Sequence, residues 1–144
     1  MPSTPPKRTI VGQLPRGIDL LEGLTEFVRK ENIRFGRIQA LGATTHAIVA
    51  YYNQSTREYQ PMEFTEGMEI LNLHGNISMR DGQPFVHIHV VLSDSQGRTW
   101  GGHVMPGTIL WALEVFIDEF EGEPPVRMKD EETGLFLWRG ERLR

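Results

Sequence analysis

Residues 84–93 read Pro-Phe-Val-His-Ile-His-Val-Val-Leu-Ser. The aromatic and β-branched residues of this stretch favour a strand. The polar tetrapeptide Asp94-Ser95-Gln96-Gly97 follows, and residues 98–105 form a second strand-like run. Two such runs joined by a short segment containing glycine predict an antiparallel β-hairpin.

Further runs of the same kind surround this hairpin, separated by segments rich in Gly, Asn, Asp and Ser. Residues 19–31 differ, because their apolar residues recur at helical spacing and Asp19 with Glu22 forms a capping arrangement. The pattern predicts an α+β fold, a mostly antiparallel β-sheet with one main amphipathic helix near the N-terminus. Residues 1–8, with three prolines, are expected to form a disordered tail before a single domain over residues 9–144. The other predicted strands are 37–41, 46–53, 57–64, 68–79 and 134–139, while 108–120 fits either a helix or a strand.

Three histidines can be placed relative to one another by strand geometry. His87 and His89 lie two residues apart, so they share one face of their strand. If Ser95-Gln96-Gly97 is a three-residue loop with Gly97 left-handed, then His103 lies opposite His89 and on the same face. A two-residue loop would turn His103 away, so the prediction depends on this loop or on a bulge at Gly101-Gly102.

Three converging imidazoles predict a site for a divalent metal, with one coordination position left open, as in catalytic zinc sites. The predicted ligands are His87, His89 and His103. Nickel, cobalt, copper and iron also suit imidazole, and histidines on a half-exposed strand can instead be solvated or hydrogen-bonded. Because the unperturbed imidazole pKa is about 6.5, metal affinity is expected to fall between pH 7 and 5.

The remaining polar residues give weaker signals. Single histidines at strand positions, His46 and His74, are interpreted as structural residues. Ser93 and Thr108 have no base and orienting group beside them, so a nucleophile triad is not indicated. The sequence leaves catalytic residues unassigned, with Glu114, Glu66, Glu69 and Arg16 as unplaced candidates for acid/base or orienting roles.

The amino-acid composition excludes several classes of function. The 144 residues are 39% hydrophobic and 24% charged, contain no Cys and carry a net charge of −4. Disulfides and thiolate metal sites are therefore excluded, and a reducing cytoplasm is the expected location. No apolar stretch approaches 18 residues, so no membrane association is expected. The acidic balance opposes extended contact with nucleic acid.

The chain resembles the plants and prokaryotes conserved (PPC) domain family. The resemblance rests on GIDLLE at 17–22, GRIQALGA at 36–43, LHGNIS at 73–78, PFVHIHV at 84–90 and GGHV at 101–104. It implies an α+β fold with residues 108–120 largely as a strand, a homotrimer, and a metal, usually zinc, on His87, His89 and His103. The fold is similar to that of acetolactate decarboxylase. Plant members carry R-G-R-P segments that bind DNA, and these 144 residues contain none.

Two functions remain open at this point. The first is a small cytoplasmic metal-binding protein, a homotrimeric module that binds a small-molecule ligand or regulates transcription in association with DNA. The alternative is a metal-dependent lyase or hydrolase that uses the open coordination position of the three-histidine site. A general acid or base beside the histidines would discriminate between them.

Overall fold

The computed structural model describes residues 3–140 and 142–143, and it has the predicted α+β class. One helix and nine strands make up this part of the chain, and the strands belong to one sheet. All strand pairs are antiparallel except a single parallel contact between β4 and β8. The elements are β1 (Pro6–Leu14), α1 (Leu20–Lys30), β2 (Gly36–Asn53), β3 (Glu58–Phe64), β4 (Met68–Arg80), β5 (Gln83–Ser93), β6 (Thr99–Val104), β7 (Ile109–Phe120), β8 (Val126–Lys129) and β9 (Phe136–Arg139).

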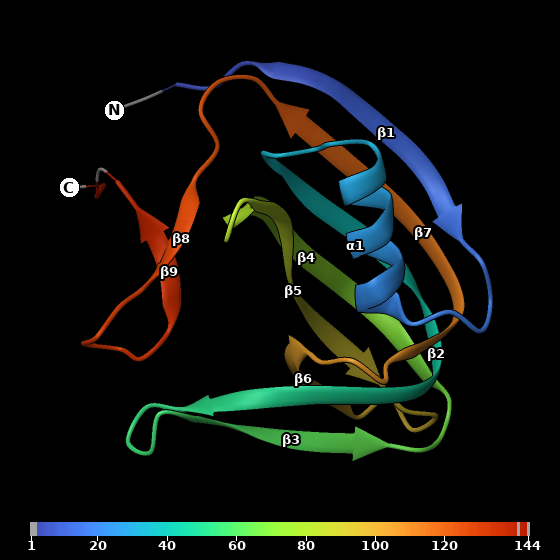
Figure 1. Cartoon of the computed structure of the whole chain (residues 1–144). Helices are drawn as coiled ribbons and strands as arrows, with labels where there is room; N and C mark the ends of the chain where they lie inside the picture. Colours follow the sequence, from blue (N-terminus) through green and yellow to red (C-terminus); the bar gives the residue numbers. More distant parts are fainter. Residues whose placement is uncertain (1–2, 141, 144) are drawn as a thin grey trace.

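Strand β2 organises the sheet (Figure 1). Its 18 residues span two of the predicted strands, 37–41 and 46–53, which are continuous in the structure. The first half of β2 pairs with β4 and β7, and the second half pairs with β3 and β6. Strands β2, β4, β5 and β6 therefore form a closed ring of pairings.

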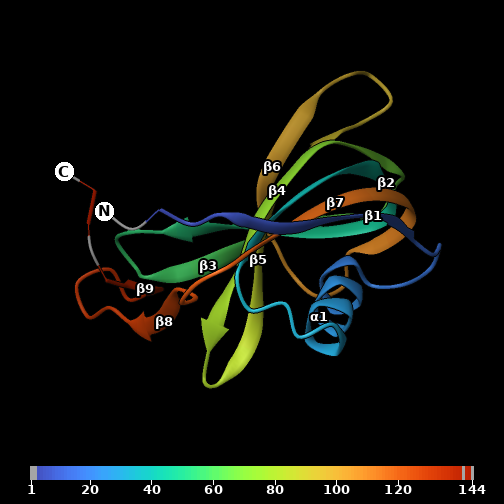
Figure 2. The same ribbon diagram turned by 90° about the horizontal axis from the view of Figure 1, so that it is seen from above.

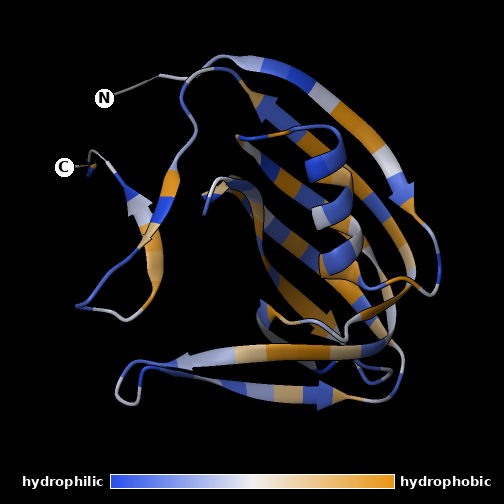
Figure 3. Ribbon diagram, in the orientation of Figure 1, coloured by the Kyte–Doolittle hydropathy of each residue, from blue (hydrophilic) through white to orange (hydrophobic). Residues whose placement is uncertain are grey.

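Helix α1 covers one face of this sheet, as Figures 1 and 2 show. Asp19 is the N-cap, and its side chain accepts a hydrogen bond from the amide of Glu22. The helix buries Leu20, Leu24 and Val28 against the strands. Hydrophobic and hydrophilic residues alternate along the strands (Figure 3), as expected for a sheet with one face on the core. Within the described residues no helix has the length and apolar character needed to cross a bilayer.

The N-terminal strand begins earlier than predicted. Strand β1 starts at Pro6 rather than near Thr9, so the predicted tail is too long by three residues. The reason is a set of ion pairs that sequence patterns do not reveal: Lys7 and Arg8 contact the carboxylate of Glu119 at 3.1 and 2.6 Å. The first two residues of the predicted tail lie outside the described residues.

Two further differences concern the second half of the chain. The ambiguous segment 108–120 is a strand, β7, because it pairs with β1 on one side and β2 on the other. The predicted final strand, 134–139, is confirmed in part as β9. It pairs with β8, a short strand that the sequence analysis did not predict.

The β5–β6 hairpin has the predicted register. Gly97 has a φ of +76°, and the amide of Asp94 donates to the carbonyl of Arg98 at 3.0 Å. His89 is therefore opposite His103. Gly102 allows β2 to approach, since a Cβ added there would lie 2.7 Å from the carbonyl oxygen of Ala50.

Replacing Gly102 with Ala should therefore destabilise the protein, by about 1–3 kcal/mol, because the β2 backbone must move to admit the methyl group. Gly12→Ala is the matched control, since an added Cβ has no atom within 4 Å there. Urea unfolding of both variants measures the difference. Equal stabilities would contradict close packing of β6 on β2 at Gly102.

Candidate metal centre

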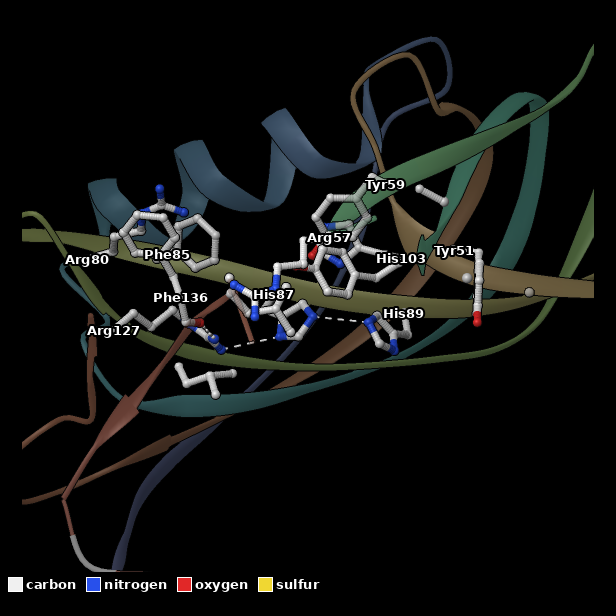
Figure 4. Close-up of a pocket in the computed structure, with 17 residues that line it drawn as sticks. Tyr51, Arg57, Tyr59, Arg80, Phe85, His87, His89, His103, Arg127 and Phe136 are labelled. Atoms are coloured by element: carbon white, nitrogen blue, oxygen red, sulfur yellow. Dashed lines mark hydrogen bonds between the residues drawn. The ribbon is translucent and has the colours of Figure 1, made fainter. Parts of the chain in front are cut away.

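His87, His89 and His103 converge on the sheet face opposite α1 (Figure 4). Strand β5 presents His87 and His89, and β6 presents His103 directly across from His89. One ring nitrogen from each histidine lies within 4.8 Å of the others. The Nε2 atoms of His87 and His89 are 3.1 Å apart. All three side chains therefore lie on the face that a three-residue loop predicts.

These residues have the donor chemistry of a transition-metal site. In a tetrahedral zinc site the bound nitrogens are about 3.3 Å apart, and the His87–His89 separation is close to this value. The buried Nδ1 atom of His103 has no hydrogen-bond partner among the described residues. Buried polar atoms without a partner are uncommon and costly, so this nitrogen fits a site that takes up a cation or a proton donor.

All three imidazoles favour the neutral form, which is the form that binds metals. Burial is the largest cause for each. Burial lowers the pKa of His87 to about 4, and the positive charge of Arg127 lowers it in the same direction. Burial also lowers the pKa of His103 to about 4, and the neighbouring His89 adds to this shift. Burial also lowers the pKa of His89. At neutral pH the three rings therefore carry no imidazolium charge that would repel a cation.

Arg127, on β8, is the neighbour that the sequence analysis missed. Its Nη2 atom lies 3.3 Å from Nδ1 of His87 and 2.7 Å from Oδ1 of Asn76, while its Nε donates to Ser78 at 2.8 Å. A guanidinium can only donate, so Nδ1 of His87 accepts and the proton of neutral His87 is on Nε2. A metal-ligating histidine usually has the opposite arrangement, with its second nitrogen donating to an acceptor.

A cavity of about 710 Å³ lies over the histidines. Strands β2, β5 and β6 form one side, and the β8–β9 hairpin, at the left of Figure 1, supplies much of the other. Tyr59 stacks near His103 with ring centroids 5.0 Å apart. Burial raises the pKa of Tyr59, so its hydroxyl is protonated at neutral pH.

Residues 1–121 match the profile of the Plants and Prokaryotes Conserved domain, abbreviated PPC or PCC. The chain belongs to the PPC domain family. This match includes all three histidines and ends before the β8–β9 hairpin.

Proteins similar to this PPC chain include a metal-containing protein from Archaeoglobus fulgidus. Its crystal structure has 40% sequence identity and a TM-score of 0.91, covering 96% of this chain and 97% of that one. A candidate DNA-binding protein from Bacteroides thetaiotaomicron has 26% identity and a TM-score of 0.85, covering 96% and 99%. The bifunctional protein GlmU of a Synechococcus strain is 36% identical over 107 residues, which are 74% of this chain and 15% of GlmU.

Of the other residues singled out in the sequence, His74 on β4 is directly opposite His89 but is not part of the three-histidine cluster. His46, Thr108 and Ser93 lie outside the cavity. His46 pairs with Glu63 at 2.8 Å, and Thr108 is buried and bonded to the backbone of Ile48. Ser93 donates to the carbonyl of Asp94. None of the unplaced candidates lines the cavity within the described part of the chain; these candidates are Glu114, Glu66, Glu69 and Arg16.

Part of the environment of His87 was within reach of sequence reasoning. The dipeptide Asp81-Gly82 forms a two-residue turn with φ values of +49° and +76°, the geometry typical of a tight hairpin. Its register sets Asn76 opposite His87. No sequence pattern indicated that Arg127 lies at the site, because β8 is held there by contacts with residues far away in the chain, such as Asn76 on β4.

The lowered pKa values predict how acid affects the metal-free protein. An unfolded histidine has a pKa of about 6.5. Between pH 6.5 and about 4 the unfolded chain therefore binds protons that folded His87 and His103 do not bind. The free energy of unfolding should fall as the pH drops through this window.

Urea unfolding of wild type and His87→Gln at several pH values tests this expectation. The variant should lose less stability than wild type between pH 6.5 and 4.5, because one of the two low-pKa groups is absent. Parallel pH profiles for the two proteins would contradict it. The same shifts move the expected loss of metal affinity below the pH 7 to 5 interval that an unperturbed histidine gives.

Proposed function

We propose that this PPC domain protein binds one divalent metal ion, zinc, through His87, His89 and His103 and presents it to a small-molecule ligand. The observation that carries the proposal is the convergence of three neutral imidazoles at the floor of an open cavity. The A. fulgidus protein, described as metal-containing, adds support. A bound zinc ion would supply a Lewis acid with an open coordination position.

The metal proposal is tested by elemental analysis and calorimetric titration with zinc. His89→Ala should lower zinc affinity by at least about 100-fold, since one of three ligands is lost. His46→Ala is the matched control, because His46 pairs with Glu63 and lies outside the cluster. Equal zinc stoichiometry and affinity in wild type and His89→Ala would refute the site.

A binding or regulatory module is favoured over the alternative of a metal-dependent lyase or hydrolase. Such an enzyme needs a general acid or base beside the metal. No Asp or Glu of the described residues lines the cavity. The hydroxyl of Tyr59, which stacks beside His103, favours the enzyme as a proton donor, but its raised pKa makes it a poor base.

We propose a homotrimer as the assembly. The sheet face opposite α1 exposes large apolar side chains on three adjacent strands: Val11 on β1 is 67% exposed, Phe116 on β7 51% and Leu41 on β2 55%. Val11 is directly opposite Phe116. Leu41 is opposite Glu114, which lies two residues before Phe116 on β7 and therefore points to the same face. All three apolar side chains thus share one face of the sheet. An apolar cluster of this kind is typical of an interface.

Sedimentation equilibrium tests the trimer. Wild type should have three times the chain mass of 16.5 kDa at micromolar concentration. Phe116→Asp should dissociate it, because the interface would bury an unpaired carboxylate. Leu143→Asp, at an exposed apolar residue outside the sheet, is the control. A monomeric wild type would rule out the assembly.

DNA is the less favoured partner, and the cytoplasm is the proposed location. The B. thetaiotaomicron relative supports DNA association, whereas the net charge of −4 favours weak binding without sequence preference. The absence of cysteine fits a reducing compartment.

A further inference from the structure

The cavity above the histidines has an unusual charge. Three arginines, Arg57, Arg80 and Arg127, line it, and no carboxylate among the described residues does. The cavity lining is therefore positively charged, although the whole sequence has a net charge of −4. Adding a divalent ion at the histidines would make the cavity more positive still.

Arg127 is the most buried of the three, with 8% of its surface exposed. Its described partners are all neutral: Ser78, Asn76, the carbonyl of Phe136 and the ring of His87. A buried charge without a counter-ion is costly, and arginines are seldom buried unless paired. The fold therefore holds a guanidinium whose charge is not balanced within the described chain.

Arg80 lies beside the same aromatic ring as Arg127, that of Phe85. Its guanidinium carbon is 3.5 Å from the ring centroid of Phe136, and both Arg80 and Arg127 lie within 5.4 Å of the ring centroid of Phe85. Its nearest described carboxylate, on Asp81, is 3.7 Å away and 87% exposed, a weak pair. No described hydrogen bond uses the Arg80 guanidinium, so its donors are available to a ligand.

We propose that this cavity binds a small organic anion, with a carboxylate or phosphate group held by Arg80 and Arg127 and an apolar body packed on Phe85 and Phe136. Planar guanidinium groups match the oxygens of both anions. The end of the ligand nearest the histidines would reach the proposed metal, so this part of the proposal rests on the proposed function. Binding of the anionic group by the arginines does not depend on the metal.

The β8–β9 hairpin supplies part of the anion site from outside the residues that the family profile matches. Arg127 and Phe136 come from this hairpin, which lies beyond the residues matched by the family profile. Two hydrogen bonds attach it to the β2–β3 hairpin: Tyr52 donates to the carbonyl of Thr133 at 2.6 Å, and Arg57 donates to that of Glu131 at 3.0 Å. The hairpin therefore supplies two of the four residues proposed to hold the anion.

Calorimetric titration with mandelate, phenylphosphonate and mandelamide tests the proposal. Mandelate carries a carboxylate, an aromatic ring and a hydroxyl, and mandelamide is its uncharged counterpart. At least one of the two anions should bind about tenfold more tightly than mandelamide, the gain expected for a charge-assisted hydrogen bond. Preference for mandelate indicates a carboxylate ligand, and preference for phenylphosphonate a phosphate or phosphonate ligand.

Arg80→Gln should remove the preference for the anion and leave mandelamide binding unchanged. This variant breaks no described hydrogen bond, so it should fold. Arg34→Gln, which removes the same charge at an exposed position outside the cavity, is the matched control and should bind like wild type. Equal affinities for the anions and mandelamide, no anion binding tighter than about 1 mM, or full preference in Arg80→Gln would overturn the proposal.

The titrations are repeated after chelation of metals from wild type. Anion preference that persists in metal-free protein supports the arginine site even if zinc binding fails, so the two proposals fail separately. Loss of the preference in both metal-loaded and metal-free protein overturns the anion site alone.

Discussion

The carboxylate of Asp94 fixes the register on which the site depends. Its Oδ1 atom accepts from the amides of Gln96 and Arg98 at 2.9 Å each, and its Oδ2 accepts from Nε of Arg98 at 2.7 Å. These bonds hold a three-residue loop between β5 and β6. A loop one residue shorter would turn His103 to the core face, because side chains alternate along a strand. The histidine cluster is thus a consequence of the loop.

Features governed by neighbours in sequence could be predicted, and those governed by distant contacts could not. Asp19 caps α1 through an amide three residues away, and Gly97 sets the hairpin register locally. Strand β7, in contrast, fits two periodicities, and its pairing with β1 and β2 decides between them. The early start of β1 and the position of Arg127 depend on residues about 50 to 110 positions away in the chain. No local pattern encodes these contacts.

Arg127 connects the electrostatics of the histidines with those of the cavity. Its charge, added to burial, favours neutral His87, which suits a metal ligand. The same charge repels a divalent cation, so Arg127 makes the imidazoles available and also opposes the ion that they would hold. An anion in the cavity removes this conflict, since it offsets both positive charges. Metal and anion are therefore expected to bind with positive coupling.

The sheet register also relates the proposed self-interface to the histidines. Phe116 is opposite Gln39, Gln39 is opposite His74, and His74 is opposite His89. Directly opposed residues share a face, so exposed apolar residues and metal-site residues belong to one cross-strand row. A second copy seated on this face at Phe116 would lie on the same side of the sheet as the histidines. The row runs Val11, Phe116, Gln39, His74, His89, His103. The proposed self-interface and the histidine cluster therefore share one face of the sheet, while α1 packs on the other face with the core.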